Sequence, residues 1–551
     1  MTVLLPDNLP LLVAAPNGIK KLRELILELA VRGKLVPQDP NDEPASELLK
    51  HINEGKVRHV AEGKLKKQKP LAPINEEEKP FELPVGWEWT RLGEITNFGT
   101  TTKRESIADD AWVLDLEDIE KDTSTLLRRA KFSERNSLSD KNSFIKGDVL
   151  YGKLRPYLSK VLVADTDGFC TTEILPFRCY GSFDAHFFKI VLKSPYFLSY
   201  VNSKSYGMKM PRLGTEDGRQ AFFPLPPLAE QHRIVVKFNE LMAMCVHLDA
   251  QQTDCESAHA RLVQGLLDSL SKSCDTADFA VNWQHLSKQF HTLFTTESSI
   301  DALKQTLLQL SVMGKLAPQN SNEEPVSFPC LGTGLKVKTE KLTKERSEPH
   351  AIPTGWKWMR LCELLEEDRD ISYGIIKLGS EPKEGGVPTL RCSDVKPGYI
   401  NLQDVRSVSP DVEQDYVRTR LRGGEILINI RGTLGGVAVV GKNLAGYNVA
   451  REVAVVPLHP VLNGHYLSMA MQSNYFWTRV NDQLRGIAYK GLNLSSLRLL
   501  PIPIPPVAEQ QRIVAIVNQL MAICDQLKNS LIQARQLNVQ LASSLVEQAV
   551  A

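Results

Sequence analysis

The sequence predicts a mixed α+β fold: two globular α/β domains joined by long antiparallel coiled-coil helices, with an internal pseudo-two-fold repeat. Three observations predict it: a long segment that occurs twice, a heptad pattern in each copy, and poorly matching residues between the copies. The chain has 551 residues, too many for one hydrophobic core, and is 42% hydrophobic and 24% charged. These values are typical of a folded protein with several domains.

The repeat organises the chain. The segment PLPPLAEQHRIVVKFNELMAMCVHL, from Pro224, returns as PIPPVAEQQRIVAIVNQLMAICDQL, from Pro503, so each shared residue reappears 279 positions later. A second pair opens the two halves: IKKLRELILELAVRGKLVPQ, from Ile19, and IDALKQTLLQLSVMGKLAPQ, from Ile300. A third pair, LPVGWEWTRLGEI and IPTGWKWMRLCEL, follows a charged spacer in each half. We therefore expect one scaffold, used twice, to carry two different domains.

Each long repeat predicts a helix that begins after paired prolines, because proline cannot continue a helix backwards. Apolar residues recur at spacings of three and four in both helices. In the first they are Ile234, Phe238, Leu241, Cys245 and Leu248; in the second they are Ile513, Val517, Leu520, Cys524, Leu527, Leu531, Ala534, Leu541 and Leu545, with Asn538 as the polar member. Such a seam requires a partner helix. A helix of some forty residues from Leu228 spans about 60 Å, against about 34 Å for one turn of B-DNA, so the helix suits a spacer.

Two shorter helices carry a matching stripe, at Ile19, Leu22, Ile26 and Leu29 and at Ile300, Leu303, Leu307 and Leu310. Both end at Gly-Lys-Leu, where Gly33 and Gly314 suit a C-terminal cap. Ordinary core packing or homodimerisation also produces such stripes. Because the chain supplies its own matching helices, intramolecular pairing is equally economical.

The repeats and their spacers predict five regions. They are an N-terminal helical region with a basic linker (1–82), a first domain (83–225), a central helical region and linker (226–351), a second domain (352–504) and a C-terminal helix (505–551).

Composition and missing motifs argue against catalysis by this chain. The nine cysteines form no CxxC pair, the eleven histidines do not cluster, and we expect a reduced, cytoplasmic protein with no metal site. No apolar run approaches the length of a membrane span. The sequence contains no GxxxxGK[ST], GxGxxG or HExxH motif and no Asn/Asp-Pro-Pro-Tyr/Phe motif of adenine methyltransferases. We expect no catalytic residue and no cofactor, so any chemistry would belong to partners.

The paired Pro-Pro-x-Ala-Glu-Gln-x-Arg-Ile-Val motifs, the Gly-Trp-x-Trp segments and Arg-Gly-Lys-Leu-Val-Pro-Gln resemble the specificity subunit of type I restriction–modification systems. The resemblance covers nearly the whole chain, and the N-terminal helix resembles one branch of that family. It implies two target recognition domains, each reading half of a bipartite, asymmetric DNA site, and a helical spacer that sets their separation. It also implies two methyltransferase subunits docked on the spacer and restriction (motor–nuclease) subunits in the complex. The specificity subunit would be required for both methylation and restriction. The partner subunits would use S-adenosylmethionine, ATP and Mg²⁺.

Residue by residue, the resemblance assigns only the scaffold and its subunit-docking region, because base-reading residues differ between specificities. The assigned residues are Pro226, Pro227, Glu230, Gln231, Arg233, Pro505, Pro506, Glu509, Gln510 and Arg512.

Candidate DNA contacts come instead from cationic and polar residues in probable loops of both domains. In the first domain they are Thr101, Thr102, Lys103, Arg104, Lys153, Arg155, Tyr157, Lys209, Arg212 and Arg219; in the second they are Tyr373, Lys377, Arg391, Arg431, Tyr489 and Lys490. The alternative for each residue is an ordinary solvated side chain. The formal net charge is only +1, so a basic surface would depend on placement in the fold.

Two runs, GKVRHVAEGKLKKQKP and KVKTEKLTKER, indicate flexible basic linkers before the domains.

A different class of function stays open on the sequence alone: a two-armed coiled-coil scaffold that binds proteins without DNA readout. A self-contained enzyme is disfavoured by the missing motifs.

Overall fold

The structure, a computed structural model, describes residues 4–62, 70–135, 139–273, 276–320, 322–324, 350–484 and 491–550. The chain forms two compact units: unit 1 is Met1–Cys255 with Ala534–Ala551, and unit 2 is Glu256–Gln533. Helices α8 (Leu228–Lys272) and α16 (Val507–Val550) each contribute residues to both units. Among the helices described, none is both long and apolar enough to cross a bilayer. The observed elements belong to the mixed α+β class that the sequence predicts.

The helical part of unit 1 contains α1 (Leu4–Ala14), α2 (Gly18–Val31) and α3 (Ala45–Ala61), with the first part of α8 and the last part of α16. Every predicted apolar residue of α2 is buried, and the stripe packs against Ile234 and Cys245 of α8 and Ala542 of α16. Lys21 of α2 donates to the carbonyl of Val539 at 3.1 Å, while Arg23 forms an ion pair with Asp249 of α8. Intramolecular pairing of the predicted seams is therefore confirmed in this unit.

Two predicted apolar positions of the second seam, Ala534 and Leu541, are exposed, so the prediction is wrong there. Leu541 is 46% exposed, whereas the next residue, Ala542, is 2% exposed and packs in the core. An α-helix drifts by about 20° per heptad from a strict seven-residue repeat. Four heptads after Ile513 the drift is about 80°, close to the angle of about 100° between successive residues. The buried face therefore moves on by one residue.

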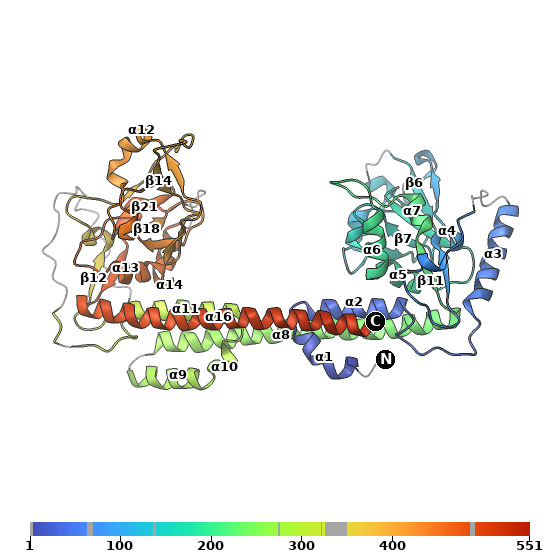
Figure 1. The fold of residues 1–551 in the computed structure, drawn as a ribbon, viewed down its shortest axis with the longest axis horizontal. Coiled ribbons are helices and arrows are strands. Elements are labelled where there is room, and N and C mark those ends of the chain that lie inside the picture. The colour runs from blue at the N-terminus through green and yellow to red at the C-terminus, as the bar shows by residue number, and fades with distance from the viewer. Residues whose placement is uncertain are drawn as a thin grey trace. The chain divides into compact units, whose positions relative to one another are not determined.

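Domain 1 lies within unit 1 and extends from β1 (Glu88–Arg91) to β11 (Phe222–Leu225), which pair with each other in antiparallel register. Figure 1 labels β6, β7 and β11 of this domain. Its main sheets have the orders β2-β10-β7-β8 and β3-β6-β9-β4-β5. The strands are β2 (Thr96–Asn97), β3 (Thr100–Thr102), β4 (Trp112–Leu114), β5 (Ala130–Lys131), β6 (Lys141–Phe144), β7 (Val149–Gly152), β8 (Val161–Val163), β9 (Gly168–Cys170) and β10 (Ile174–Cys179).

Four helices complete domain 1: α4 (Leu92–Ile95), α5 (Ala185–Lys193), α6 (Pro195–Lys204) and α7 (Thr215–Gln220). Phe187 and Phe188 of α5 and Phe197 of α6 are buried in the same core as α2. The domain therefore packs directly on the scaffold helix that precedes it in the sequence.

Domain 2 lies within unit 2 and extends from β12 (Lys357–Arg360) to β22 (Pro501–Ile504), which also pair in antiparallel register. Its larger sheets have the orders β13-β21-β18-β19 and β17-β14-β20, and β15 pairs with β16. The strands are β13 (Ser372–Tyr373), β14 (Val387–Leu390), β15 (Val395–Lys396), β16 (Tyr399–Ile400), β17 (Arg406–Val408), β18 (Ile426–Asn429), β19 (Val437–Val439), β20 (Asn448–Val449) and β21 (Val453–Val456). The helices are α12 (Pro410–Glu413), α13 (Gly464–Gln472), α14 (Asn474–Leu484) and α15 (Leu494–Arg498).

The helical part of unit 2 contains α9 (Thr276–Lys288), α10 (Phe290–Leu293) and α11 (Glu297–Val312). Ile300, Leu303 and Leu307 of α11 pack in one cluster with Leu267 of α8 and Cys524 of α16. The second predicted seam is therefore also buried inside its own unit.

The predicted glycine caps are confirmed: Gly33 has φ +66° and Gly314 has φ +69°. A Cβ at either glycine would meet the ring of a following proline, Pro84 or Pro353, at 2.5 Å or less. One expectation about the linkers was wrong. Residues 55–61, predicted as flexible linker, are the second half of helix α3, where Lys56 Nζ donates to the carbonyl of Gly93. The second basic run lies outside the described residues.

Candidate nucleic-acid interface

The repeated glutamate closes the joint between each domain and its long helix. Glu230, at the start of α8, is buried and accepts hydrogen bonds from Trp87 Nε1 at 2.9 Å and Gln38 Nε2 at 3.0 Å. Burial raises the pKa of Glu230, and the two hydrogen bonds oppose that rise. The second copy repeats both bonds: Trp356 Nε1 donates to Glu509 at 3.0 Å, and Gln319 Nε2 at 2.7 Å.

The repeated glutamine lies beside it and joins the helix to the domain through backbone groups. Gln231 Nε2 donates to the carbonyl of Pro226 at 3.0 Å, and its Oε1 accepts from the backbone N–H of Asp184, the N-cap of α5. In the second copy Gln510 donates to Pro505 at 2.9 Å and accepts from Asn463, the N-cap of α13. The motif therefore fixes the first domain helix relative to the long helix.

The repeated arginine is half-buried and pairs with an acidic residue that follows the short helix. Arg233 binds both carboxylate oxygens of Asp42, at 3.2 and 2.6 Å, and Arg512 binds both oxygens of Glu323. The four prolines, Pro226, Pro227, Pro505 and Pro506, are buried. These side chains serve the scaffold, and subunit docking at them stays a prediction.

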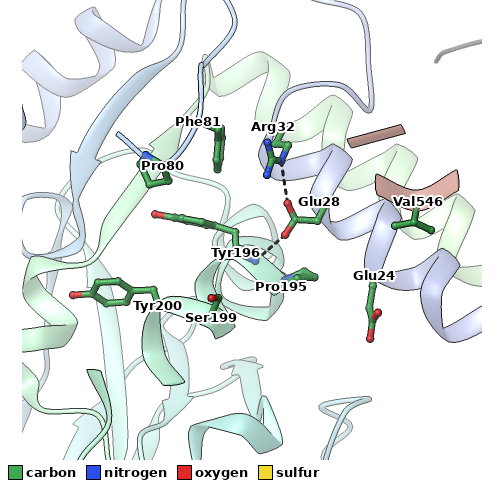
Figure 2. A pocket seen from close by; sticks show the side chains of 10 residues that line it. All are labelled: Glu24, Glu28, Arg32, Pro80, Phe81, Pro195, Tyr196, Ser199, Tyr200 and Val546. Carbon is green, nitrogen blue, oxygen red and sulfur yellow. Dashed lines mark hydrogen bonds and ion pairs between the residues drawn. The ribbon is translucent and has the colours of Figure 1, made fainter. Parts of the chain in front are cut away.

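A cavity of about 580 Å³ opens beside the first joint, between α2, α6 and the segment around Phe81 (Figure 2). Glu28 accepts from Arg32 Nε at 3.0 Å and from the backbone N–H of Tyr196 at 2.7 Å. The guanidinium of Arg32 stacks over the ring of Phe81 at 4.5 Å. These contacts hold α6 against α2.

Several candidate DNA-contacting residues of domain 1 lie around one turn, residues 171–173, which joins β9 to β10 and is called the central turn below. Arg219 does not, and lies against Gly93 of α4. Lys153, which follows β7, donates its N–H to the carbonyl of Glu173 at 2.9 Å and accepts from Leu213 at 3.0 Å. The N–H of Arg155 donates to the carbonyl of Pro211 at 2.7 Å. The segments 153–157 and 206–213, separate in the sequence, therefore lie side by side.

Strand β3 reaches the same place. Thr101 Oγ1 donates to Asn142 Oδ1 at 3.1 Å, and Asn142 Nδ2 donates to the carbonyl of Ile174, the residue after the central turn. Thr102 is half-buried at the end of this strand, and Lys103 and Arg104 follow it as exposed residues.

Not all the candidate cations of domain 1 are available to a ligand. Arg212 binds both carboxylate oxygens of Glu173, at 3.0 and 3.1 Å. The side chain of Arg219 is 16% exposed and lies 3.5 Å from Glu216. Within the described part of the chain, five others have no side-chain hydrogen bond or ion pair: Lys103, Arg104, Lys153, Arg155 and Lys209.

Domain 2 contains an equivalent central turn, residues 450–452, between β20 and β21. Ile430, which follows β18, donates to the carbonyl of Glu452 at 2.8 Å and accepts from Leu492 at 2.8 Å. These are the same two backbone bonds that Lys153 makes to Glu173 and Leu213 in domain 1. Two domains with poorly matching sequences thus share the same local architecture at this edge.

The candidates of domain 2 collect at this turn as well. The backbone N–H of Arg431 donates to the carbonyl of Glu452, and the backbone N–H of Arg451 donates to the carbonyl of Ile375. The backbone N–H of Ala450 donates to the carbonyl of Leu390, which precedes Arg391. The guanidinium of Arg391 binds Asp394 and the carbonyl of Asp404, so it is engaged. Lys377 and Arg431 are exposed and have no side-chain partner among the described residues.

Tyr373, in β13, and Tyr157, beside Arg155, are both partly exposed. Tyr489 and Lys490 lie outside the described residues. Four residues at these turns are absent from the predicted set: Arg451, which is half-exposed at the central turn of domain 2, and Tyr206, Met208 and Met210 in domain 1. Aligning TTEI with AREV across the two copies is the signal that would have found Arg451.

A duplicated scaffold whose two domains present cations at equivalent turns defines a class of protein, the double-headed DNA-recognition subunit. A family model of the type I restriction modification DNA specificity domain matches residues 353–534. The chain is 34% identical to the type I restriction enzyme EcoAI specificity subunit of Escherichia coli, over 97% of this chain and 94% of that protein. It is 35% identical to the EcoEI specificity subunit of the same species, over the same shares. A chain in a solved type I R-M system structure aligns with 86% of this chain and 99% of its own length, at 18% identity and a TM-score of 0.53.

The chain belongs to the family of type I restriction enzyme specificity subunits. It is therefore a non-catalytic DNA-specificity subunit that works within a complex with modification and restriction subunits.

Proposed function

We propose that domain 1 and domain 2 each read one half of a bipartite, asymmetric DNA site through the loops around their central turns. The observation that supports this most is the pair of equivalent turns. Each has the same two backbone hydrogen bonds, and each is surrounded by cations without side-chain partners among the described residues. In domain 1 these are Lys103, Arg104, Lys153, Arg155 and Lys209; in domain 2 they are Lys377 and Arg431. Arginine and lysine at loop positions suit phosphates and guanine edges.

The candidates whose side chains are engaged in ion pairs have a different proposed role. Arg212, Arg219 and Arg391 hold the reading loops in shape through their acidic neighbours. Thr101, Thr102, Tyr157 and Tyr373 would add hydroxyl contacts beside the cations.

We further propose that α8 and α16 set the number of unread base pairs between the half-sites, and that two methyltransferase subunits dock, one near each joint. The support is that the side-chain bonds of Glu230, Gln231 and Arg233 are repeated by Glu509, Gln510 and Arg512. A partner that fits one copy of such a joint has a second, pseudo-equivalent place to bind. Restriction subunits would join this assembly, and the assembly would act in the cytoplasm, where its duplex DNA lies.

Replacement of residues 84–225 by the corresponding domain of another family member tests the assignment of the two half-sites. The assembled methyltransferase complexes are incubated with random-sequence duplexes, and the bound DNA is sequenced. One half of the selected site should change, while the other half and the gap are retained. A change in both halves, or selection of no split sequence by the original chain, would overturn the proposal.

A further inference from the structure

The segment 207–211 of domain 1 forms a closed loop at the protein surface. Tyr206 and Arg212 pair as an antiparallel bridge, with N–H to carbonyl distances of 3.1 and 2.9 Å in the two directions. Gly207 has φ +101°, a conformation that L side chains rarely adopt, and a Cβ there would lie 3.0 Å from the carbonyl oxygen of Met210. The loop is therefore a tight finger with a defined base.

The base of this finger is attached to the rest of the domain at three points, one at the central turn and two at the segment 153–157. Arg212 binds both oxygens of Glu173, Pro211 accepts from Arg155 at 2.7 Å, and Leu213 donates to Lys153 at 3.0 Å. The finger is fixed beside the cations proposed to contact DNA.

The finger carries large apolar side chains that the domain leaves exposed to a large extent. Met208 is 105% exposed relative to a reference residue, Tyr206 is 61% exposed and Met210 is 49% exposed. Large apolar side chains grouped at one exposed point mark a contact surface. Lys209 lies between the two methionines, and the segment from Tyr206 to Arg212 contains no acidic residue.

We propose that Met208 and Met210 form a wedge that inserts between neighbouring base pairs of the half-site read by domain 1, while Lys209 and Arg155 bind the flanking phosphates. This inference rests on the proposed DNA-reading function and adds a distortion of the duplex to it. Apolar wedges of this kind, methionine among them, partly unstack base steps and bend the duplex. Methionine is unbranched and adaptable, which suits a slot between two bases.

The charge around the finger favours DNA over a protein partner. Of the carboxylates near its base, Glu173 is already bound by Arg212, and the half-buried Asp217 lies near Tyr206. The side chains of three cations there, Lys153, Arg155 and Lys209, have no partner among the described residues. A positively charged rim around an apolar tip fits a stack of bases between two phosphate backbones. The half-site would then be read partly by deformability, with a flexible pyrimidine–purine step at the wedge.

The test uses the assembled methyltransferase complex and its selected DNA site. The fluorescent base 2-aminopurine replaces adenine at one position at a time through the domain 1 half-site, excluding the methylated adenine. The unaltered complex should give a several-fold rise in fluorescence at one step, because an unstacked 2-aminopurine is brighter. Met208→Gln with Met210→Gln should abolish that rise and weaken binding about tenfold. Met208→Leu with Met210→Leu should retain both, since leucine keeps an apolar wedge.

Ile145→Gln is the matched control, because Ile145 is exposed in the same domain at the opposite end of β7. It should leave the fluorescence and the affinity unchanged. Specific binding by the unaltered complex without a fluorescence rise at any step would overturn the wedge and leave the DNA-reading proposal standing. Failure to select any DNA would overturn both. If the glutamine variant lost methyltransferase subunits instead, the finger would be a protein contact and the wedge proposal would be wrong.

Discussion

Trp87, the residue before β1, donates its indole N–H to the carboxylate of Glu230 in the first turn of α8 at 2.9 Å, across 143 positions of sequence. Trp356 and Glu509 repeat the bond at 3.0 Å in unit 2. Each carboxylate is 1% exposed, so two separate domains are held to the scaffold by the same buried, charge-assisted contact.

Glu230→Ala should loosen the joint of domain 1 alone. The change leaves the buried N–H of Trp87 without an acceptor, at a cost of about 1 to 3 kcal/mol. The exposed Gln38 keeps its hydrogen bond to the carbonyl of Gly33. Hydrogen exchange followed by mass spectrometry should show faster exchange in residues 84–92 and no change in residues 353–361. Glu509→Ala should show the reverse. The exposed Glu240 on α8 provides the control, and equal exchange in Glu230→Ala and Glu240→Ala would contradict this role.

Lys193, in the last turn of α5, should make the stability of unit 1 rise with pH. Burial lowers its pKa to about 8 from the ordinary 10.5, and the nearby Lys189 lowers it further. Between these values the unfolded chain binds the proton and the folded chain does not, so raising the pH stabilises the folded state in this window. The thermal midpoint of the original chain, measured relative to that of Lys193→Met, should therefore rise as the pH is raised from about 8 to 10.5. A difference that stays constant with pH would show that Lys193 does not titrate in this window.

Lys153 and Arg155 should contribute to the salt dependence of DNA binding. Each phosphate contact that is lost lowers the slope of log K against log salt by about 0.9. We expect this decrease for Lys153→Ala and Arg155→Ala, measured by fluorescence anisotropy of the assembled complex at several salt concentrations. Lys146 lies before the same strand, β7, at its opposite end, and Lys146→Ala should leave the slope unchanged. Equal slopes in all three variants would remove these residues from the interface.

Lengthening both long helices should widen the accepted gap between half-sites. Leu248 packs in the unit 1 core and Asp249 pairs with Arg23, but residues 251–258 of α8 are exposed. Insertion of four residues after Thr253 and four after Gln536 adds about 6 Å to each helix. Since one base pair occupies about 3.4 Å, the gap selected from random DNA should grow by one or two base pairs. Retention of the original gap would argue against the spacer role.

Much of the scaffold could be predicted because its signals are local or repeated. Helix seams, glycine caps and proline starts depend on neighbours within a few residues, and Gly33 and Gly314 adopt the conformations that their positions indicate. The buried face of α16 could not be followed to its end by counting heptads. The exposure of Leu541 and the burial of Ala542 depend on how a nearly straight helix meets its partners over four heptads.

The candidate site divides in the same way. From its sequence alone, the chain was identifiable as a duplicated scaffold with two divergent domains and cationic loops, because duplication and composition are properties of a string of residues. Only the tertiary structure decided which cations are available: Arg212 is engaged because Glu173, 39 positions away, is brought to 3.0 Å, whereas Lys153 and Arg155 meet no carboxylate among the described residues. It also decided that Glu230 is a buried acceptor for Trp87 rather than a surface charge at a helix start. An ion pair or a buried hydrogen bond between distant segments depends on the folded path of the chain, and the spacing of residues along the sequence does not encode that path.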